Sequence, residues 1–243
     1  YQRALTFAPD MVAADFNLGV LFQERGNADA AAAAYRHVLA ADPKHAKSHN
    51  NLALALVELG RLDEAASHFR TSLELSPKAE IWSDYGFTMA RLGKRDEALA
   101  AYGKALAIDP ACPSAHLNLA VVGIQTGNFA DAEQHYRQAL PGRPTAETHN
   151  GLGYVLLRQG RTDEAFAEFR TAIAVDPSYT PAYNNLADGL ARQDRNAEAE
   201  ELYRKSIELK PSASVYAALG DVQRRLGKNA EAEEQYARAK ALG

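Results

Sequence analysis

The sequence predicts an all-α solenoid, in which one pair of antiparallel helices is stacked on copies of itself. Two regularities carry this prediction: an alanine recurs every 33 or 34 residues, and an aromatic residue follows each alanine by four positions. The alanines are Ala31, Ala65, Ala98, Ala132, Ala165, Ala199 and Ala232, and the aromatic residues are Tyr35, Phe69, Tyr102, Tyr136, Phe169, Tyr203 and Tyr236. Such a period means that each unit buries its apolar face mainly against its neighbours. These positions are therefore predicted to pack the core.

Three recurring residues predict the first helix of each unit. A leucine or tyrosine is followed directly by a small residue, and a terminating residue stands seven positions after the small one. Six terminators are glycines and one is an aspartate, residue types that tolerate the left-handed conformation beyond a helix end. They are Gly26, Gly60, Gly93, Gly127, Gly160, Asp194 and Gly227. Between these marks the apolar residues recur at three and four positions, which is the helical period. We expect first helices near residues 12–25, 46–59, 79–92, 113–126, 146–159, 180–193 and 213–226.

The second helix of each unit is predicted to end before a proline, which lacks an N–H group and biases the preceding residue away from helix. The prolines are Pro9, Pro43, Pro77, Pro110, Pro144, Pro177 and Pro211. We expect second helices near residues 28–41, 62–75, 95–108, 129–140, 162–175, 196–209 and 229–241. Residues 1–11 match only the second helix of a partial unit, and seven units follow at 12–45, 46–78, 79–112, 113–145, 146–179, 180–212 and 213–243.

Two local departures stand out. Gly123 replaces a bulky residue within a predicted helix, and the same unit ends in the run Pro141 to Pro144, so its second helix is expected to be short. This unit is predicted to be a weak seam, with a functional hinge as an alternative. The linkers after the prolines also alternate between two residues and one, which suggests that the packing of units alternates with period two.

The repeated pattern of bulky residue, leucine, glycine, tyrosine, alanine, phenylalanine and proline resembles the tetratricopeptide repeat over residues 12–243. The resemblance implies a right-handed superhelix whose first helices line the concave face. It also implies a scaffold rather than a particular chemistry, because members of this family share a fold and differ in function.

Composition narrows the function further. The chain has 243 residues, 47% of them hydrophobic and 24% charged, with a net charge of −4, so nucleic-acid binding is not expected. No apolar run approaches the roughly 20 residues that a membrane helix needs. Cys112 is the single cysteine, which excludes an intrachain disulfide and favours a reducing compartment such as the cytoplasm. We predict a chain with no cofactor and no enzymatic activity of its own.

The histidines do not form a metal site in this reading. His49, His116 and His149 share the fourth position of their first helices, where Asp15, Trp82 or a tyrosine stands in the other units. Metal ligands must converge at about 2 Å on one ion, whereas equivalent positions on stacked units lie much farther apart. No metal is therefore predicted. Acidic pairs such as Asp63 and Glu64 begin second helices, where they favour the positive end of the helix dipole.

The inward positions of this family, two, six, nine and thirteen of each unit, form three rows. The sixth position carries asparagines, the ninth is largely apolar, and the thirteenth changes from Glu24 and Glu58 to arginines. An asparagine amide donates and accepts at once, so it suits a peptide backbone. The predicted peptide-binding residues are Asn17, Asn51, Leu54, Phe87, Asn118, Val121, Tyr154, Arg158, Asn185, Arg192 and Arg225. Asp188 and Asp221 lie one turn before Arg192 and Arg225 and are expected to pair with them.

The asparagine row resembles the ladder in the repeat domain of O-GlcNAc transferases, where it holds an extended polypeptide. Here the row is broken at Asp84, Gly151 and Ala218. The leading hypothesis is a protein-interaction scaffold that binds an extended peptide or a partner helix in its groove. Two alternatives stay open: a substrate-recognition or assembly segment of a larger enzyme such as a glycosyltransferase, and a structural array that associates end to end.

Overall fold

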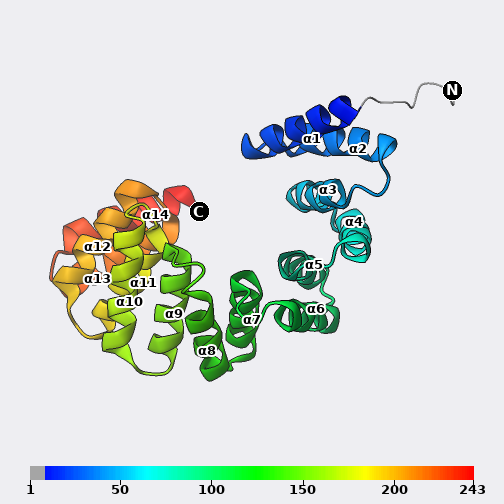
Figure 1. The fold of residues 1–243 in the computed structure, drawn as a ribbon. Coiled ribbons are helices and arrows are strands. Elements are labelled where there is room, and N and C mark those ends of the chain that lie inside the picture. Colours follow the sequence, from blue (N-terminus) through cyan, green and yellow to red (C-terminus); the bar gives the residue numbers. More distant parts are fainter. Residues whose placement is uncertain (1–8) are drawn as a thin grey trace. The chain divides into compact units, whose positions relative to one another are not determined.

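The protein is seen here in a computed structural model that describes residues 9–243, a stretch that contains fourteen helices and no strand (Figure 1). The first helices of the units are α1 (Pro9–Glu24), α3 (Ala46–Glu58), α5 (Ala79–Arg91), α7 (Pro113–Thr126), α9 (Ala146–Arg158), α11 (Thr180–Arg192) and α13 (Ala213–Arg225). The second helices are α2 (Ala28–Ala41), α4 (Leu62–Leu75), α6 (Arg95–Ile108), α8 (Phe129–Ala139), α10 (Thr162–Val175), α12 (Asn196–Leu209) and α14 (Asn229–Leu242). The predicted all-α class is confirmed.

The helices pack in chain order as antiparallel pairs, and the chain divides into two compact units, residues 1–118 and 119–243. In the first, α1 packs on α2, α3 on α4 and α5 on α6; in the second, α9 packs on α10, α11 on α12 and α13 on α14. Second helices also pack against the first helix that follows them: α2 on α3 and α4 on α5 in the first unit, and α8 on α9, α10 on α11 and α12 on α13 in the second.

The predicted terminators of the first helices adopt the left-handed conformation. The six glycines have φ between 69° and 80°, and Asp194, at φ 58°, is the non-glycine residue with positive φ. After six of the seven terminators, the next residue donates its N–H to a carbonyl five positions earlier, as Arg61 does to Leu56 at 2.8 Å. These bonds satisfy carbonyls that the helix end leaves without partners.

The linkers alternate in conformation as well as in length. In the longer linkers an aspartate side chain accepts a hydrogen bond from the backbone N–H two residues later: Asp42 from Lys44 at 3.0 Å, Asp109 from Ala111 at 3.0 Å and Asp176 from Ser178 at 2.8 Å. In the shorter linkers the residue before the helix is extended, with ψ of 149° at Lys78 and 146° at Ser212. The predicted period of two is therefore present in the linkers.

The core consists of the recurring alanines and the rings that follow them. Ala31, Ala165, Tyr35 and Phe169 are completely buried, as are most of their equivalents. Burying one such ring stabilises the fold by roughly 1.5–3 kcal/mol.

Three details refine the predictions from sequence. Helix α1 begins at Pro9, three residues before the expected start, because proline suits the first turn of a helix. The partial helix predicted before it falls largely outside the described residues. Helix α8 is short, as expected, and Gly123 packs tightly: a Cβ there would lie 2.9 Å from the Cβ of Ala132 and 3.1 Å from the carbonyl oxygen of Asn128. This close approach accounts for the glycine without a hinge.

Candidate functional site

The first helices lie on the inner side of each compact unit. Helix α3 contacts both α1 and α5, and α11 contacts both α9 and α13, whereas second helices of successive repeats share no comparable set of contacts in the described part of the chain. Closer spacing of the first helices makes their side concave within each unit. Figure 1 shows α3 and α5 on one side of the first unit and α4 and α6 on the other.

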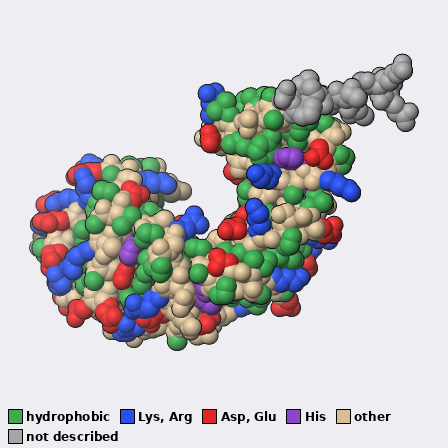
Figure 2. Space-filling model, viewed as in Figure 1, with side chains coloured by type: hydrophobic (Ala, Val, Ile, Leu, Met, Phe, Trp, Pro, Cys, Tyr) green, Lys and Arg blue, Asp and Glu red, His purple; other side chains and the backbone are tan. Residues whose placement is uncertain are grey.

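The predicted binding rows lie on a solvent-reachable face of these helices. Phe87 and Val121 are 43% and 45% exposed, which is unusual for large apolar side chains, and Leu54 and Tyr154 are partly exposed. All the residues of the thirteenth position are exposed. Figure 2 shows acidic and basic side chains interspersed over the visible surface rather than gathered in one basic patch.

The asparagine row joins neighbouring repeats. Asn51 Nδ2 donates to Tyr35 Oη at 3.3 Å, Asn118 Nδ2 donates to Ser83 Oγ at 3.2 Å, and Asn185 Nδ2 donates to Asn150 Oδ1 at 2.8 Å. Asn17 is exposed. In each of these three bonds the acceptor belongs to the preceding repeat. The bonds of Asn118 and Asn185 join adjacent first helices, and that of Asn51 joins α3 to the second helix α2. A second amide hydrogen of each remains as a possible contact for a ligand, whereas Asn51 Oδ1 already accepts a hydrogen bond from Asn50 Nδ2 at 3.2 Å.

One break in this row has a structural explanation, and a second leaves a visible structural consequence. A Cβ at Gly151 would lie 2.5 Å from Tyr136 Oη, so the tyrosine of the preceding repeat occupies the space that an asparagine would need. Ala218 stands one repeat after Asn185 and has no side-chain donor. Asn184, which is equivalent to the acceptor Asn150, therefore has its Oδ1 atom buried without a hydrogen bond. Ala218 thus leaves a buried acceptor without a hydrogen bond, whereas the break at Gly151 follows from packing between repeats.

Replacing Gly151 with alanine tests this explanation. We expect the free energy of unfolding to fall by roughly 1–3 kcal/mol, the usual cost of overpacking, because the new methyl group meets the ring of Tyr136. Gly103→Ala is the matched control, since a Cβ at this helical glycine meets nothing within 4 Å. The control should be neutral or slightly stabilising in urea denaturation. Equal effects of the two substitutions would contradict the explanation.

The arginines of the thirteenth position differ in whether they bind other groups of the protein. Arg91 Nη1 donates to the carbonyl of Val57, and Arg225 Nη1 donates to that of Ala191, both at 3.1 Å. Each cation thus caps the C-terminal end of the preceding first helix, where the helix dipole is negative. Arg158 lies 4.5 Å from the centroid of the Phe129 ring and donates to Tyr154 Oη at 2.9 Å. Arg192 is exposed and forms no hydrogen bond or ion pair with another described residue.

The predicted pairs of Asp188 with Arg192 and of Asp221 with Arg225 are not formed. Asp188 instead accepts a hydrogen bond from Tyr203 Oη, and Asp221 accepts one from Tyr236 Oη at 2.8 Å. The tyrosines reach these carboxylates from the second helix of the same repeat, while Arg225 reaches across to the neighbouring repeat. Burial, together with the bond to Asp188, raises the pKa of Tyr203.

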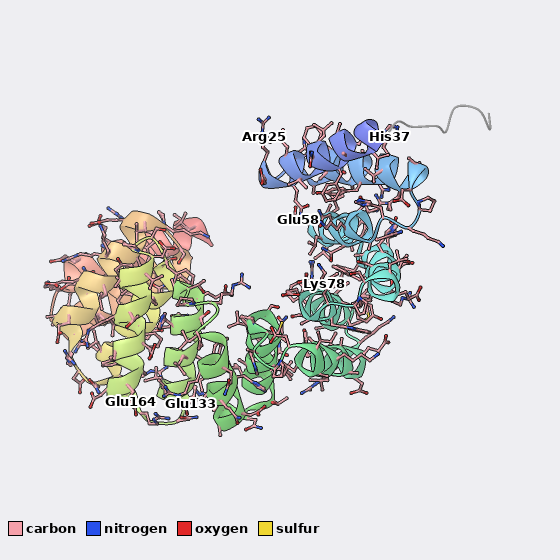
Figure 3. All side chains as sticks on the ribbon, in the orientation of Figure 1. Arg25, His37, Glu58, Lys78, Glu133 and Glu164 are labelled. Carbon is pink, nitrogen blue, oxygen red and sulfur yellow. The ribbon has the colours of Figure 1, made fainter. Side chains whose placement is uncertain are left out.

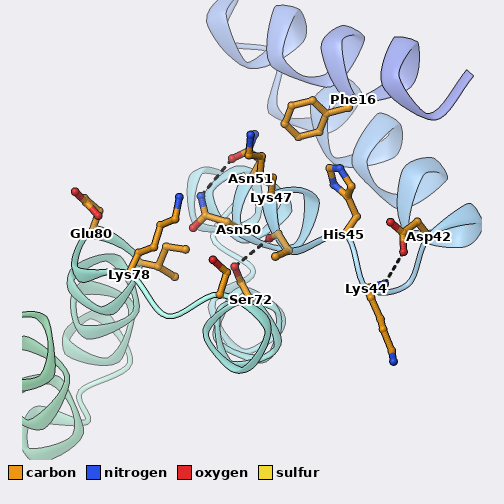
Figure 4. Close-up of a pocket in the computed structure, with 13 residues that line it drawn as sticks. Phe16, Asp42, Lys44, His45, Lys47, Asn50, Asn51, Ser72, Lys78 and Glu80 are labelled. Carbon is orange, nitrogen blue, oxygen red and sulfur yellow. Dashed lines mark hydrogen bonds between the residues drawn. The ribbon is translucent and has the colours of Figure 1, made fainter. Parts of the chain in front are cut away.

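A cavity of about 600 Å³ in the first compact unit is lined, apart from Asn51, by residues outside the predicted peptide-binding set. It is formed by the α2–α3 linker, the start of α3, the end of α4 and the start of α5 (Figure 4). Its lining comprises Phe16, Asp42, Lys44, His45, Ala46, Lys47, Asn50, Asn51, Ser72, Ser76, Lys78, Glu80 and Ile81. The signal available in the sequence was the lysine directly after the proline, which occurs only in the first two linkers.

The histidines of the fourth position contact groups within their own repeat or its linker. His49 Nδ1 lies 2.9 Å from His68 Nδ1, and His149 Nδ1 lies 2.7 Å from Glu168 Oε2. Burial is the main cause that lowers the pKa of His68, and the neighbouring His49 lowers it further. Within residues 9–243 no three His, Cys, Asp or Glu side chains are arranged to hold a metal, and Cys112 is buried as a free thiol.

The stacked antiparallel pairs and their exposed inner face define the tetratricopeptide-repeat class of protein-interaction scaffold. More particularly, the family described as the cilia and flagella-associated protein 70 C-terminal domain matches residues 6–214, and a tetratricopeptide repeat matches residues 213–242. Since the first match covers most of the chain, the chain belongs to that family.

The chain is similar to the following proteins. Anaphase-promoting complex subunit 7 of Dictyostelium discoideum is 29% identical over 112 residues, which are 43% of this chain and 19% of that protein. Protein O-mannosyl-transferase Tmtc3 of Drosophila melanogaster is 28% identical over 150 residues, 61% of this chain and 14% of that protein. The structure of the anaphase-promoting complex hetero-tetramer Cut9–Hcn1 has a TM-score of 0.77 at 16% identity, covering 98% of this chain and 44% of that one.

The chain thus spans less than a fifth of the length of both named relatives. The described helices include none with the length and apolar character to cross a membrane.

Proposed function

We propose that the inner face of the first helices binds an extended peptide or a helix of a partner protein. The observation that carries the proposal is the row of partly exposed apolar side chains in the ninth position. Leu54 and Phe87 belong to the first compact unit, and Val121 and Tyr154 belong to the second. Large apolar side chains that follow one another at the same position of successive repeats favour a contact surface over a solvated face.

Polar groups flank this row and suit the backbone and acidic groups of a ligand. Asn51, Asn118 and Asn185 each keep one amide hydrogen beyond the bond that joins the repeats. Arg192 offers a guanidinium that no described residue engages, and such a group binds a carboxylate well. The apolar row would supply affinity and these groups orientation.

Truncation of Phe87 tests the proposal. Peptides selected on the wild-type chain from a displayed random library serve as the probe, and their dissociation constants are then measured for variants. Phe87→Ala should weaken binding by roughly 1–3 kcal/mol, the scale of an aromatic anchor. Leu75→Ala is the control, because Leu75 is similarly exposed, at 40%, but lies on second helix α4. The proposal fails if the control weakens binding and Phe87→Ala does not.

A second candidate is that the chain is a recognition or assembly segment of a larger enzyme. The match to a protein O-mannosyl-transferase favours it, because 61% of this chain aligns with only 14% of that protein. In that case the groove would hold a polypeptide substrate for a catalytic domain elsewhere in the protein. Sequencing the complete gene product decides between the two, since this candidate requires a linked catalytic domain.

A further inference from the structure

We propose that the cavity lined by Lys47 and Lys78 binds an acidic side chain, phosphorylated or carboxylic, of a polypeptide partner. The inference rests on the proposed function, because the partner is taken to be a polypeptide lying on the first helices. It adds the chemical class of the group that the first compact unit recognises.

Lysines and carboxylates line the cavity. Lys47 is the second residue of α3 and Lys78 directly precedes α5, and neither ammonium group forms an ion pair or hydrogen bond with a described residue. Lys44 also lines the cavity, although its side chain extends away from the other two in Figure 4. The acidic lining residues are Asp42, which already accepts the N–H of Lys44 at 3.0 Å, and the exposed Glu80. Three lysines and two carboxylates thus line one space, and the backbone of Lys44 already engages Asp42.

The uncharged polar groups add donors. His45 Nδ1 accepts the N–H of Ser48 at 3.2 Å, so the neutral ring carries its proton on Nε2 and presents a donor there. Figure 4 shows Lys78 pointing toward Asn50, on the side of the cavity opposite Phe16 and His45. Two ammonium groups, an imidazole N–H and the amide of Asn51 are the partners that an oxyanion requires.

The size and lining of the cavity indicate that the anion is part of a chain. A volume of about 600 Å³ is in the range of ligand sites and much larger than one phosphate or carboxylate group needs. Apolar side chains from Phe16 and Ile81 line part of the remainder. Asn51 belongs both to this cavity and to the asparagine row, so the cavity is continuous with the proposed peptide surface.

The test uses three short peptides of one neutral sequence that carry phosphoserine, aspartate or serine at the centre. Binding is measured by titration calorimetry at constant ionic strength, with inorganic phosphate as a probe that is independent of the peptide. We expect saturable binding of phosphoserine or aspartate peptide and none of the serine peptide. Whichever of these two peptides binds more tightly shows whether the cavity prefers a phosphorylated or a carboxylic side chain. The double variant Lys47→Gln, Lys78→Gln should raise the dissociation constant about tenfold or more, as expected for losing charge-assisted hydrogen bonds.

The control is Lys94→Gln with Lys104→Gln, which removes the same charge from the same compact unit but outside the cavity. Binding should be retained in this control and restored by Lys47→Arg with Lys78→Arg. The inference is overturned if neither acidic peptide binds, or if both double glutamine variants weaken binding equally. Loss of acidic-peptide binding alone, with Phe87-dependent binding of selected peptides intact, would leave the proposed function standing.

Discussion

Replacing Phe169 with alanine should lower the free energy of unfolding by about 3–5 kcal/mol, the usual cost of removing a buried phenylalanine ring. The ring is completely buried on α10, and it lies against Gly153 of α9 so closely that a Cβ at the glycine would be 2.7 Å from its Cε1 atom. Removing the ring therefore leaves a cavity between the two helices of one repeat. Since repeats are stabilised by their neighbours, hydrogen exchange should accelerate first in α9 and α10.

The matched control is Phe87→Ala, which makes the same chemical change at an exposed ring of a first helix. Because 43% of Phe87 is already exposed, we expect a loss of about 1 kcal/mol or less. Urea denaturation compares the two variants directly. Similar losses of stability would mean that Phe87 is a core residue, and the proposed binding surface would then lose its main member.

The helix boundaries could be predicted because their causes are local. Gly60 and Asp194 adopt the left-handed conformation at the expected positions, and the prolines follow the second helices as expected. A residue type with a special backbone preference acts within a few positions of itself. Such effects can be read from the sequence without knowing what packs against the helix.

The roles of the inner-face side chains could not be predicted in the same way, because they depend on the neighbouring repeat. Asn185 donates to Asn150, which lies 35 positions earlier in the sequence, and Arg225 donates to Ala191, 34 positions earlier. The periodicity placed both residues on the correct face, but only the structure shows which side chains are engaged. The cavity beside Lys47 and Lys78 likewise requires two linkers that lie far apart in the sequence.

Two carboxylates of the second compact unit, Glu133 and Glu200, form ion pairs with the next repeat, and the sequence did not single them out. Glu133 accepts hydrogen bonds from Arg161 at 2.7 Å and from Arg137 at 2.9 Å. Arg161 also donates to Glu164, which is labelled beside Glu133 in Figure 3. The equivalent Glu200 contacts Arg204 and Lys228, both at 2.7 Å, and the buried Gln223 at 3.1 Å. Each carboxylate joins a second helix to the repeat that follows it.

Glu200→Gln should lower the free energy of unfolding by about 1.5–3 kcal/mol at neutral pH, the cost of losing hydrogen bonds to a charged group. Glu200 is only 4% exposed, so water cannot replace the lost interactions fully. The control is Glu201→Gln, which removes one charge from the adjacent, exposed position of the same helix, where the carboxylate forms no hydrogen bond or ion pair with a described residue. The control should change stability by less than about 0.5 kcal/mol.

The effect of this substitution should depend on pH. Burial alone would raise the pKa of Glu200, but the bonds from Lys228 and Gln223 and the charge of Arg204 outweigh it and hold the pKa below its ordinary value. A carboxylate whose pKa is depressed in the folded state stabilises the protein above its unfolded pKa, about 4.3, and this contribution is lost as the pH falls through the folded pKa. The difference between wild type and Glu200→Gln should therefore be constant near neutral pH and shrink below about pH 4.5. A difference that persists unchanged into that acidic range would show that the charge of Glu200 does not hold the last two repeats together.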